Sequence, residues 1–272
     1  MTLTEAVRRY YDANTPFFVR WGSSAQARSI HRAVWAAGVR SLDEALNYSN
    51  QLLLTEIESL NRAALRVVDL GCGVGGSLHY LAGRLTAPAA LVGLTLSPVQ
   101  ARLAQTHNPG KIIEGDFLRV PLAGGADVVY SVEAFIHSPN AEAYLAEAAR
   151  LLNPGGRLIL IDDFRAESAP ENHYWLEAYR RGWHASNLQT VPHVDSLARA
   201  RGLRLIANRH LTPHLRLRAL PNAMAVALHE AGRRLPLRHP LWPSTLGSMA
   251  LQQALQLGLI EYRCLVWEKE ER

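Results

Sequence analysis

A short apolar segment that runs into a glycine-rich turn constrains the fold of this chain more than any other feature. Residues 67–70 read as a buried strand that ends close to an acidic residue, Asp69. The turn that follows contains four glycines, at Gly71, Gly73, Gly75 and Gly76. A helix is expected to begin near Ser77. Because glycine reaches positive φ and has no side chain, a ligand can lie directly against such a backbone. The turn is therefore predicted to bind a cofactor.

Two kinds of cofactor loop share this spacing, and a turn without any ligand is a third alternative. Gly71, Gly73 and Gly76 match a dinucleotide-binding fingerprint, in which the N-terminus of the helix holds a pyrophosphate. Asp69 argues against a pyrophosphate, because a carboxylate repels that anion and attracts an ammonium group instead. A nicotinamide dinucleotide also needs an acid after the next strand to hold its ribose, and the chain has Thr95 at that position.

The pattern of strand, turn and helix continues beyond this loop and predicts a parallel sheet with helices on both faces. Strands are expected at residues 66–70, 90–94, 111–114, 126–131, 157–162, 204–207 and 260–267. Helices are expected after the first two strands, at 141–152, at 194–200 and over a stretch at 215–258 that prolines interrupt. The chain is thus predicted to be an α/β domain at 63–272 preceded by a helical N-terminal cap at 1–62.

Two helix starts have clear local signals. Ser97 is expected to cap a helix that has Pro98 at its first position, where proline is well tolerated. Ser41 and Glu44 have the spacing of a capping box before an apolar-periodic run that continues to Leu60.

Composition indicates the setting of the protein. Cys72 and Cys264 have no metal-ligand spacing and do not suggest a disulfide framework, so no metal is expected. Residues 1–14 lack the apolar core of a secretory signal. No apolar run approaches the ~20 residues of a membrane helix, so no integral membrane segment is expected. A cytoplasmic location is predicted.

The formal net charge of +5 comes almost entirely from arginine. A solvated surface explains such a charge, and an anionic substrate is the functional alternative because arginine binds phosphate and carboxylate well. Arginines that could hold an anionic headgroup are Arg201, Arg204, Arg209, Arg216 and Arg218. No lysine-rich tail or nucleic-acid module is visible, so no nucleic-acid partner is expected. The sequence leaves the oligomeric state open, a homo-oligomer included.

Residues 69–75 have the form Asp-x-Gly-x-Gly-x-Gly, in which the chain resembles the class I S-adenosylmethionine (SAM) methyltransferases. Residues 93–100, Gly-Leu-Thr-Leu-Ser-Pro-Val-Gln, resemble a segment of the group that contains the sterol, tocopherol and cyclopropane-fatty-acid enzymes. Shorter segments that resemble this group are at 10–12, 17–18, 21–24 and 153–156. The resemblance covers most of residues 62–268 and implies a Rossmann-like, seven-stranded class I sheet with SAM as cofactor.

The resemblance also implies which residues contact SAM. Asp69 would face the methionine ammonium, Thr95 and Gln100 would lie around the ribose and adenine, and Asp116 would contact the adenine amine. The complete set is Tyr11, Asp69, Gly71, Gly73, Gly75, Thr95, Leu96, Gln100, Asp116, Phe117 and Ser131.

The segment after the fourth predicted strand lies where the methyl group would be transferred. Its Glu133-Ala134-Phe135 is similar to the acid followed by small or aromatic residues in the sterol enzymes. Methylation of an alkene carbon creates a carbocation, which needs negative or π-electron density nearby and a base to remove a proton. Glu133 is expected to supply both. His137 is the alternative base, suited to a phenol or a carboxylic acid.

Residues 164–192 break the α/β rhythm and are rich in aromatic side chains, so they are expected to form a substrate lid at the carboxyl edge of the sheet. Predicted substrate contacts are Phe18, Phe135, Tyr174, Trp175 and Trp183. The expected function is methylation of a small, largely apolar metabolite, anionic or isoprenoid in class, with C-methylation preferred to O- or N-methylation. A nicotinamide oxidoreductase and a non-enzymatic SAM-binding subunit are the rival hypotheses.

Overall fold

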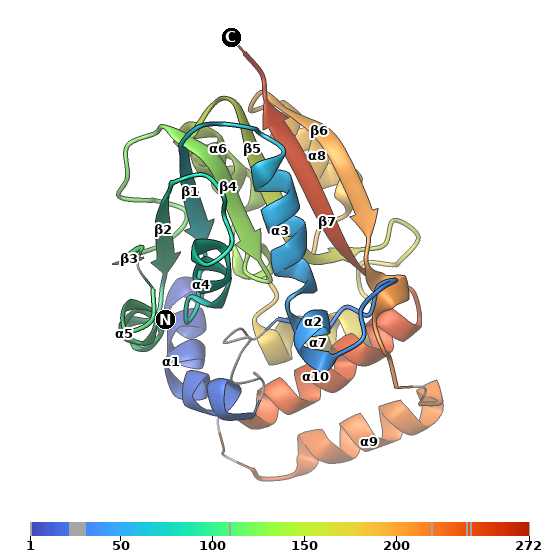
Figure 1. The fold of residues 1–272 in the computed structure, drawn as a ribbon. Helices are drawn as coiled ribbons and strands as arrows, with labels where there is room; N and C mark the ends of the chain where they lie inside the picture. The colour runs from blue at the N-terminus through green and yellow to red at the C-terminus, as the bar shows by residue number, and fades with distance from the viewer. Residues whose placement is uncertain are drawn as a thin grey trace.

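The computed structural model describes residues 2–21, 31–108, 110–218, 220–237, 239 and 241–271. These residues are arranged around one seven-stranded sheet of order β3-β2-β1-β4-β5-β7-β6 (Figure 1). The strands are β1 (Leu65–Leu70), β2 (Ala89–Thr95), β3 (Lys111–Glu114), β4 (Ala126–Val132), β5 (Leu152–Arg165), β6 (Leu203–His210) and β7 (Ile260–Lys269). β7 pairs antiparallel with β5 and β6, and the other strand pairs of the sheet are parallel. The predicted class I sheet is therefore confirmed.

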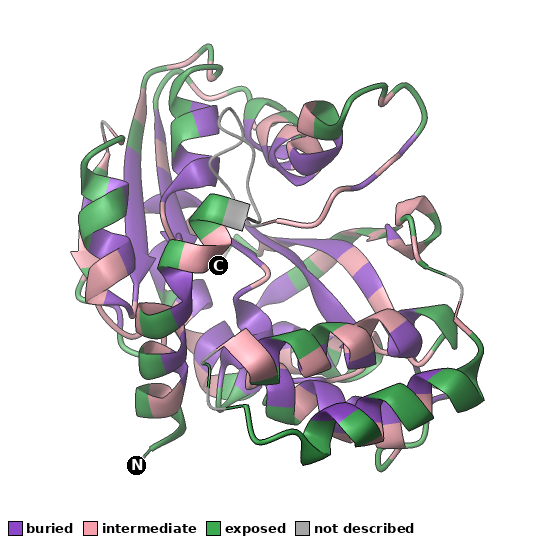
Figure 2. Cartoon of the chain, turned by 90° about the horizontal axis from the view of Figure 1, so that it is seen from below, coloured by how far each residue is buried: buried purple, intermediate pink, exposed green. Residues whose placement is uncertain are grey.

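Helices cover both faces of the sheet and its carboxyl edge. They are α1 (Leu3–Trp21), α2 (Leu42–Leu46), α3 (Tyr48–Glu58), α4 (Gly76–Ala82), α5 (Pro98–Gln105), α6 (Ala141–Leu151), α7 (Tyr174–Trp183), α8 (Val191–Arg199), α9 (Asn222–Arg234) and α10 (Leu241–Gln256). One apolar core lies between the sheet and helices α6 and α8, and a second lies between the sheet and helices α3, α4 and α5. Every residue of β4 is buried, as expected of a central parallel strand (Figure 2).

A third core forms at the carboxyl edge, where α7 packs on α10. A Cβ placed on Gly182 would come within 2.4 Å of the Gly247 Cα, so the two helices cross at a point where only glycine fits. The aromatic side chains of α7 contribute to this core. None of the described helices has the length and apolar character needed to cross a bilayer.

Local start signals are correct, but two predicted boundaries are not. Ser97 caps α5 with Pro98 in its first turn, and Ser41 accepts a hydrogen bond from the Glu44 N–H over 3.2 Å. The run to Leu60 is two helices rather than one, because the backbone at Asn47 leaves the helical conformation.

The predicted turn at 153–156 lies inside β5 as an irregularity. The pairing of β5 with β4 changes there from Ala126–Leu152 to Val128–Arg157. β5 also continues to Arg165, beyond its predicted end, because β7 pairs with it as far as Ile260. The division into a cap at 1–62 and a lid at 164–192 remains a prediction.

Candidate active site

The loop after β1 has the conformation that its glycines predict. Gly71 and Cys72 both donate their N–H groups to the Leu94 carbonyl oxygen, at 2.9 and 2.8 Å, which ties the loop to β2. Gly71 has φ +103°, and a Cβ there would lie 2.4 Å from the Ala134 Cβ. A Cβ on Gly73, with φ +53°, would meet nothing closer than the Gln100 Nε2 atom at 4.0 Å. Gly73 therefore leaves open a cradle that a side chain would fill.

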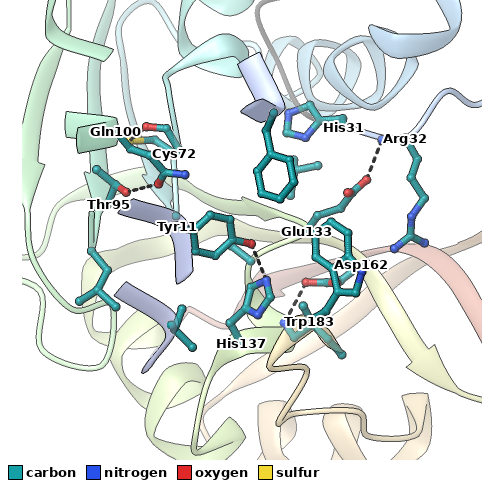
Figure 3. Close-up of a pocket in the computed structure, with 18 of the residues that line it drawn as sticks. Tyr11, His31, Arg32, Cys72, Thr95, Gln100, Glu133, His137, Asp162 and Trp183 are labelled. Carbon is teal, nitrogen blue, oxygen red and sulfur yellow. Dashed lines mark hydrogen bonds between the residues drawn. The ribbon is translucent and has the colours of Figure 1, made fainter. Parts of the chain in front are cut away.

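This cradle is one end of a cavity of about 480 Å³, a size typical of small-molecule sites. Predicted cofactor residues that line the cavity are Tyr11, Gly71, Gly73, Thr95, Leu96, Gln100, Asp116 and Phe117. Thr95 donates its hydroxyl to the Gln100 Oε1 atom over 2.8 Å, and both side chains are buried (Figure 3). Because each fixes the other, the polar groups at this end are preorganised.

Three predicted cofactor residues, Asp69, Gly75 and Ser131, are not among the residues that line the cavity. Gly75 is the N-cap of α4, with φ +83°, so it allows the loop to turn into the helix. Asp69 is 3% exposed, and burial raises its pKa from 3.8 to about 7. Ser131 is fully buried within β4. A direct cofactor contact predicted for these three residues has no support from their placement.

The cavity wall next to the loop is formed by the segment after β4. Glu133 has φ +53°, a strained conformation for a residue other than glycine, and its N–H donates to the Ile161 carbonyl oxygen. Its Oε1 atom accepts hydrogen bonds from the Arg32 N–H at 2.9 Å and from the Tyr262 hydroxyl at 2.8 Å. Figure 3 shows the carboxylate between Arg32 and the cavity. Strained backbone at a cavity wall is typical of a functional residue.

Arg32 is itself held by an ion pair that sequence analysis missed. Its guanidinium donates two hydrogen bonds of 2.5 Å to the Asp163 carboxylate, which also accepts the Tyr179 hydroxyl at 2.6 Å. Asp163 is fully buried, and Arg32 also lies over the Tyr262 ring at 4.6 Å. This network fixes the two donors that hold Glu133.

A second missed residue is Asp162, which lines the cavity beside Glu133. Burial, and then the negative charge of Asp163, raise its pKa well above the ordinary value. The signal that could have identified this pair is its position, since two adjacent acids end an otherwise apolar strand.

His137 also lines the cavity, but both of its ring nitrogens are engaged. Nε2 lies 2.7 Å from the Tyr11 hydroxyl, and Nδ1 lies 3.3 Å from the His184 carbonyl oxygen (Figure 3). Since a carbonyl only accepts, Nδ1 carries the proton and Nε2 accepts from Tyr11. Burial lowers the pKa of His137 from 6.5 to about 4, so the ring is neutral at physiological pH.

This neutral ring gives folding stability a pH dependence. Between pH 6.5 and about 4 the unfolded chain binds a proton at His137 that the folded chain does not, so stability falls as the pH falls through that window. The loss approaches roughly 3 kcal/mol. We expect His137→Gln to remove this part of the slope when urea unfolding is measured at several pH values.

Burial raises the pKa of Asp69, so the contribution of Asp69 to folding stability changes with pH in the opposite direction and is present in the wild type and in each variant. The effect of His137 is therefore measured as a difference from the wild type and from a matched variant. The same substitution at His79, an exposed histidine, should leave the slope of the wild type unchanged. An unaltered slope in His137→Gln would contradict the assignment.

The predicted substrate residues separate into two groups. Phe18 and Trp183 line the cavity and stack on each other, with centroids 5.8 Å apart and planes inclined by 7°. Phe135, Tyr174 and Trp175 do not line it. Phe135 packs in the core against Tyr144, and Trp175 donates its indole N–H to Asn222 of α9. The substrate contacts predicted for these three have no support from their placement, because their rings pack in the core or against α9.

Most of the arginines predicted to hold an anionic headgroup do not line the cavity. Of the five arginines, Arg216 alone lines the cavity, while Arg201, Arg204 and Arg209 pair with Glu142, Glu268 and Glu56. Residues 22–24 of the 21–24 segment lie outside the described residues. Within the described ranges, no cluster of three or more His, Cys, Asp or Glu side chains is placed to hold a metal.

Comparisons with known proteins agree with this geometry. A family model described as "Methyltransferase domain" matches residues 68–160. Tocopherol O-methyltransferase of Arabidopsis thaliana is 34% identical over 133 residues, which cover 46% of this chain and 36% of that protein. Sarcosine/dimethylglycine N-methyltransferase of Halorhodospira halochloris is 28% identical, with 61% of each chain covered. The chain thus spans between 36% and 61% of the length of these two relatives.

Solved structures match over almost the whole chain. A geranyl diphosphate methyltransferase in complex with geranyl diphosphate and sinefungin has a TM-score of 0.77 at 17% identity, covering 98% of this chain and 100% of that one. A cyclopropane synthase of Mycobacterium tuberculosis has a TM-score of 0.74 at 18% identity, covering 98% of each. At these identities the likeness shows the fold. The family model therefore places a methyltransferase domain at residues 68–160, and the chain as a whole shares the fold of these solved structures.

Proposed function

We propose that the protein transfers the methyl group of SAM to a small, largely apolar acceptor, by C-methylation of an isoprenoid-type alkene. The observation that carries this proposal is one continuous cavity whose wall contains both the glycine loop and Glu133. Relatives named for sterol C-methylation and a structural neighbour that holds geranyl diphosphate support the acceptor class. The rest of the proposal is drawn from this chain's own residues.

The loop end of the cavity fits SAM. Its backbone can lie against the methionine part at Gly71 and Gly73, where added side chains would clash or fill the cradle. Thr95 and Gln100 would offer hydroxyl and amide groups to the ribose, and Asp116, which lines the cavity with Phe117, would contact the adenine. Tyr11 of α1 covers this end from the cap.

The other end fits an apolar acceptor. Phe18, Trp183, Leu251 and Leu255 supply apolar walls, whereas Glu133 supplies a carboxylate at the junction with the loop end. Such walls exclude water and align the acceptor, which are the main contributions a protein makes to methyl transfer.

Methyl transfer would break the S–C bond of SAM and the π bond of the alkene and form a C–C bond; the later deprotonation would break a C–H bond and form an O–H bond on Glu133 and a new π bond. The sulfonium of SAM supplies the electrophilic methyl group. The π electrons of the alkene form the new carbon–carbon bond, and the sulfur keeps the pair from the broken bond, which gives S-adenosylhomocysteine. The acceptor is left as a carbocation, which the Glu133 carboxylate stabilises before removing a neighbouring proton to restore a double bond.

His137 is poorly placed to act as the base. His137 has a pKa of about 4, and its Nε2 lone pair accepts the Tyr11 hydroxyl proton. Within the described residues, both hydrogen bonds to Glu133 go to Oε1, so Oε2 is the basic atom. O- or N-methylation of a specialised metabolite is the second candidate, favoured by relatives named for those reactions.

We also propose that residues 1–62 act as a cap and residues 164–192 as a lid over the cavity. The first contributes Tyr11, Phe18 and Arg32 to the cavity wall, and the second contributes Tyr179 and Trp183. A cytoplasmic location remains part of the proposal.

Calorimetric titration with S-adenosylhomocysteine, with NADH as the control ligand, tests the cofactor. Micromolar binding of the homocysteine product and none of NADH is expected. Binding of NADH alone, or of neither, would overturn the proposal. Transfer of a labelled methyl group to prenyl acceptors, followed by mass spectrometry of the product, then distinguishes C- from O- or N-methylation.

A further inference from the structure

Helix α9 carries an apolar stripe that the described part of the chain does not cover. Met224 and Leu228 are 47% and 54% exposed, and Leu235 and Leu237 just beyond the helix are each 51% exposed. Residues 224 and 228 are four positions apart in α9, so they lie on one side of the helix. This side borders the buried side, which contains Ala225, His229 and Gly232.

The position of α9 makes this stripe the outer surface of the molecule. In Figure 1, α9 is the helix farthest from the sheet, and α10 lies between the two. Figure 2 shows exposed residues along the outward side of the outer helices. Scattered single apolar residues are ordinary on a surface, whereas a contiguous exposed stripe usually marks an interaction site.

Positive charge is concentrated in the same region of the sequence. Residues 211–260 contain five arginines and a single acidic residue, Glu230, in a chain whose net charge is +5. Glu230 is not free, because it pairs with Arg233 and accepts the Tyr174 hydroxyl proton. The apolar stripe therefore lies in a segment that carries most of the chain's excess positive charge.

We propose that α9 and the following residues up to 237 dock on the surface of an anionic lipid membrane. An apolar helix side in a basic segment is the combination that lies in a lipid interface, with apolar burial and attraction to anionic headgroups acting together. A second copy of this chain is a poorer partner, since a two-fold interface would set the same arginine-rich surface against itself.

Docking would also orient the cavity. Leu215 and Leu217, in the segment that leads into α9, line the cavity together with Leu251 and Leu255 of α10. An apolar acceptor dissolved in the membrane would then enter from the lipid side. This consequence rests on the proposed methyl transfer, whereas docking itself does not.

Sedimentation with lipid vesicles tests the docking. The wild-type protein should bind phosphatidylcholine vesicles that contain phosphatidylglycerol, and bind vesicles of phosphatidylcholine alone more weakly. Leu228→Glu should weaken the binding at least about tenfold, because it removes a leucine that would be buried in the lipid and adds a negative charge that the anionic headgroups repel. Leu103→Glu is the matched control, because Leu103 is an exposed leucine on α5. It should bind like the wild type.

Calorimetry with S-adenosylhomocysteine checks both variants for an intact fold. Failure of the wild type to bind either vesicle would overturn the docking proposal, as would equal losses in Leu228→Glu and Leu103→Glu. A concentration-dependent dimer that Leu228→Glu dissociates, without vesicle binding, would identify a second copy as the occupant and also overturn it. None of these outcomes depends on methyl transfer, which the cofactor titration tests separately.

Discussion

Replacing Glu133 with glutamine is expected to lower kcat by about 10²–10⁴-fold, the range of a lost general base. Glutamine keeps the shape of the side chain, and its carbonyl oxygen can still accept from the Arg32 N–H and the Tyr262 hydroxyl. What it loses is the negative charge and the ability to take a proton. Affinity for S-adenosylhomocysteine should change little, because Glu133 lies at the acceptor end of the cavity. Single-turnover kinetics with the acceptor found by screening measures the effect.

Glu142→Gln is the matched control, since Glu142 pairs with Arg201 at the surface and its side chain is 60% exposed. It should have wild-type turnover. Undiminished turnover in Glu133→Gln would remove Glu133 from the mechanism. An equal loss of cofactor affinity and turnover would instead place its carboxylate in cofactor binding.

Replacing Gly73 with leucine is expected to abolish measurable binding of SAM and of its product. The Gly73 Cβ position has open space before it, with the Gln100 amide 4.0 Å away, so a leucine side chain would project into the cradle. The cradle is the place where the methionine part of the cofactor must approach the backbone closely. Calorimetric titration with S-adenosylhomocysteine measures the loss.

A bulky residue at positive φ also strains the backbone, and Gly202→Leu separates the two effects. Gly202 has φ +72°, a Cβ there would meet nothing within 4 Å, and it does not line the cavity. Both variants should lose similar stability, roughly 1–2 kcal/mol from the left-handed conformation. Only Gly73→Leu should lose the ligand. Normal affinity in Gly73→Leu would refute the assignment of the loop.

The features that sequence predicted well are set by short stretches of chain. The glycine loop and the Ser97 cap each follow from steric limits or hydrogen bonds between residues a few positions apart, and the strands follow from short apolar runs. The extension of β5 to Arg165 has a different origin, because it depends on pairing with β7, which is distant in the chain.

The aromatic side chains show where local pattern stops being informative. Phe18 and Trp183 line the cavity, but Trp175, on the same helix as Trp183, is buried against α9. An aromatic residue at helical spacing has the same sequence signal in either setting, since both sites are apolar. The choice between core and cavity is made when α7 packs on α10.

By itself, the sequence determined the class of fold, the cofactor loop and the two candidate bases, because these depend on backbone conformations and motifs that are local. Only the tertiary structure decided which residues hydrogen-bond to the two candidate bases and how deeply each base is buried. Arg32 and Glu133 are 101 residues apart in the chain, and Arg32 and Asp163 are 131 apart. The pKa of His137 likewise depends on its burial in the folded chain. Such contacts carry no local signal, since they exist only after distant segments have packed together.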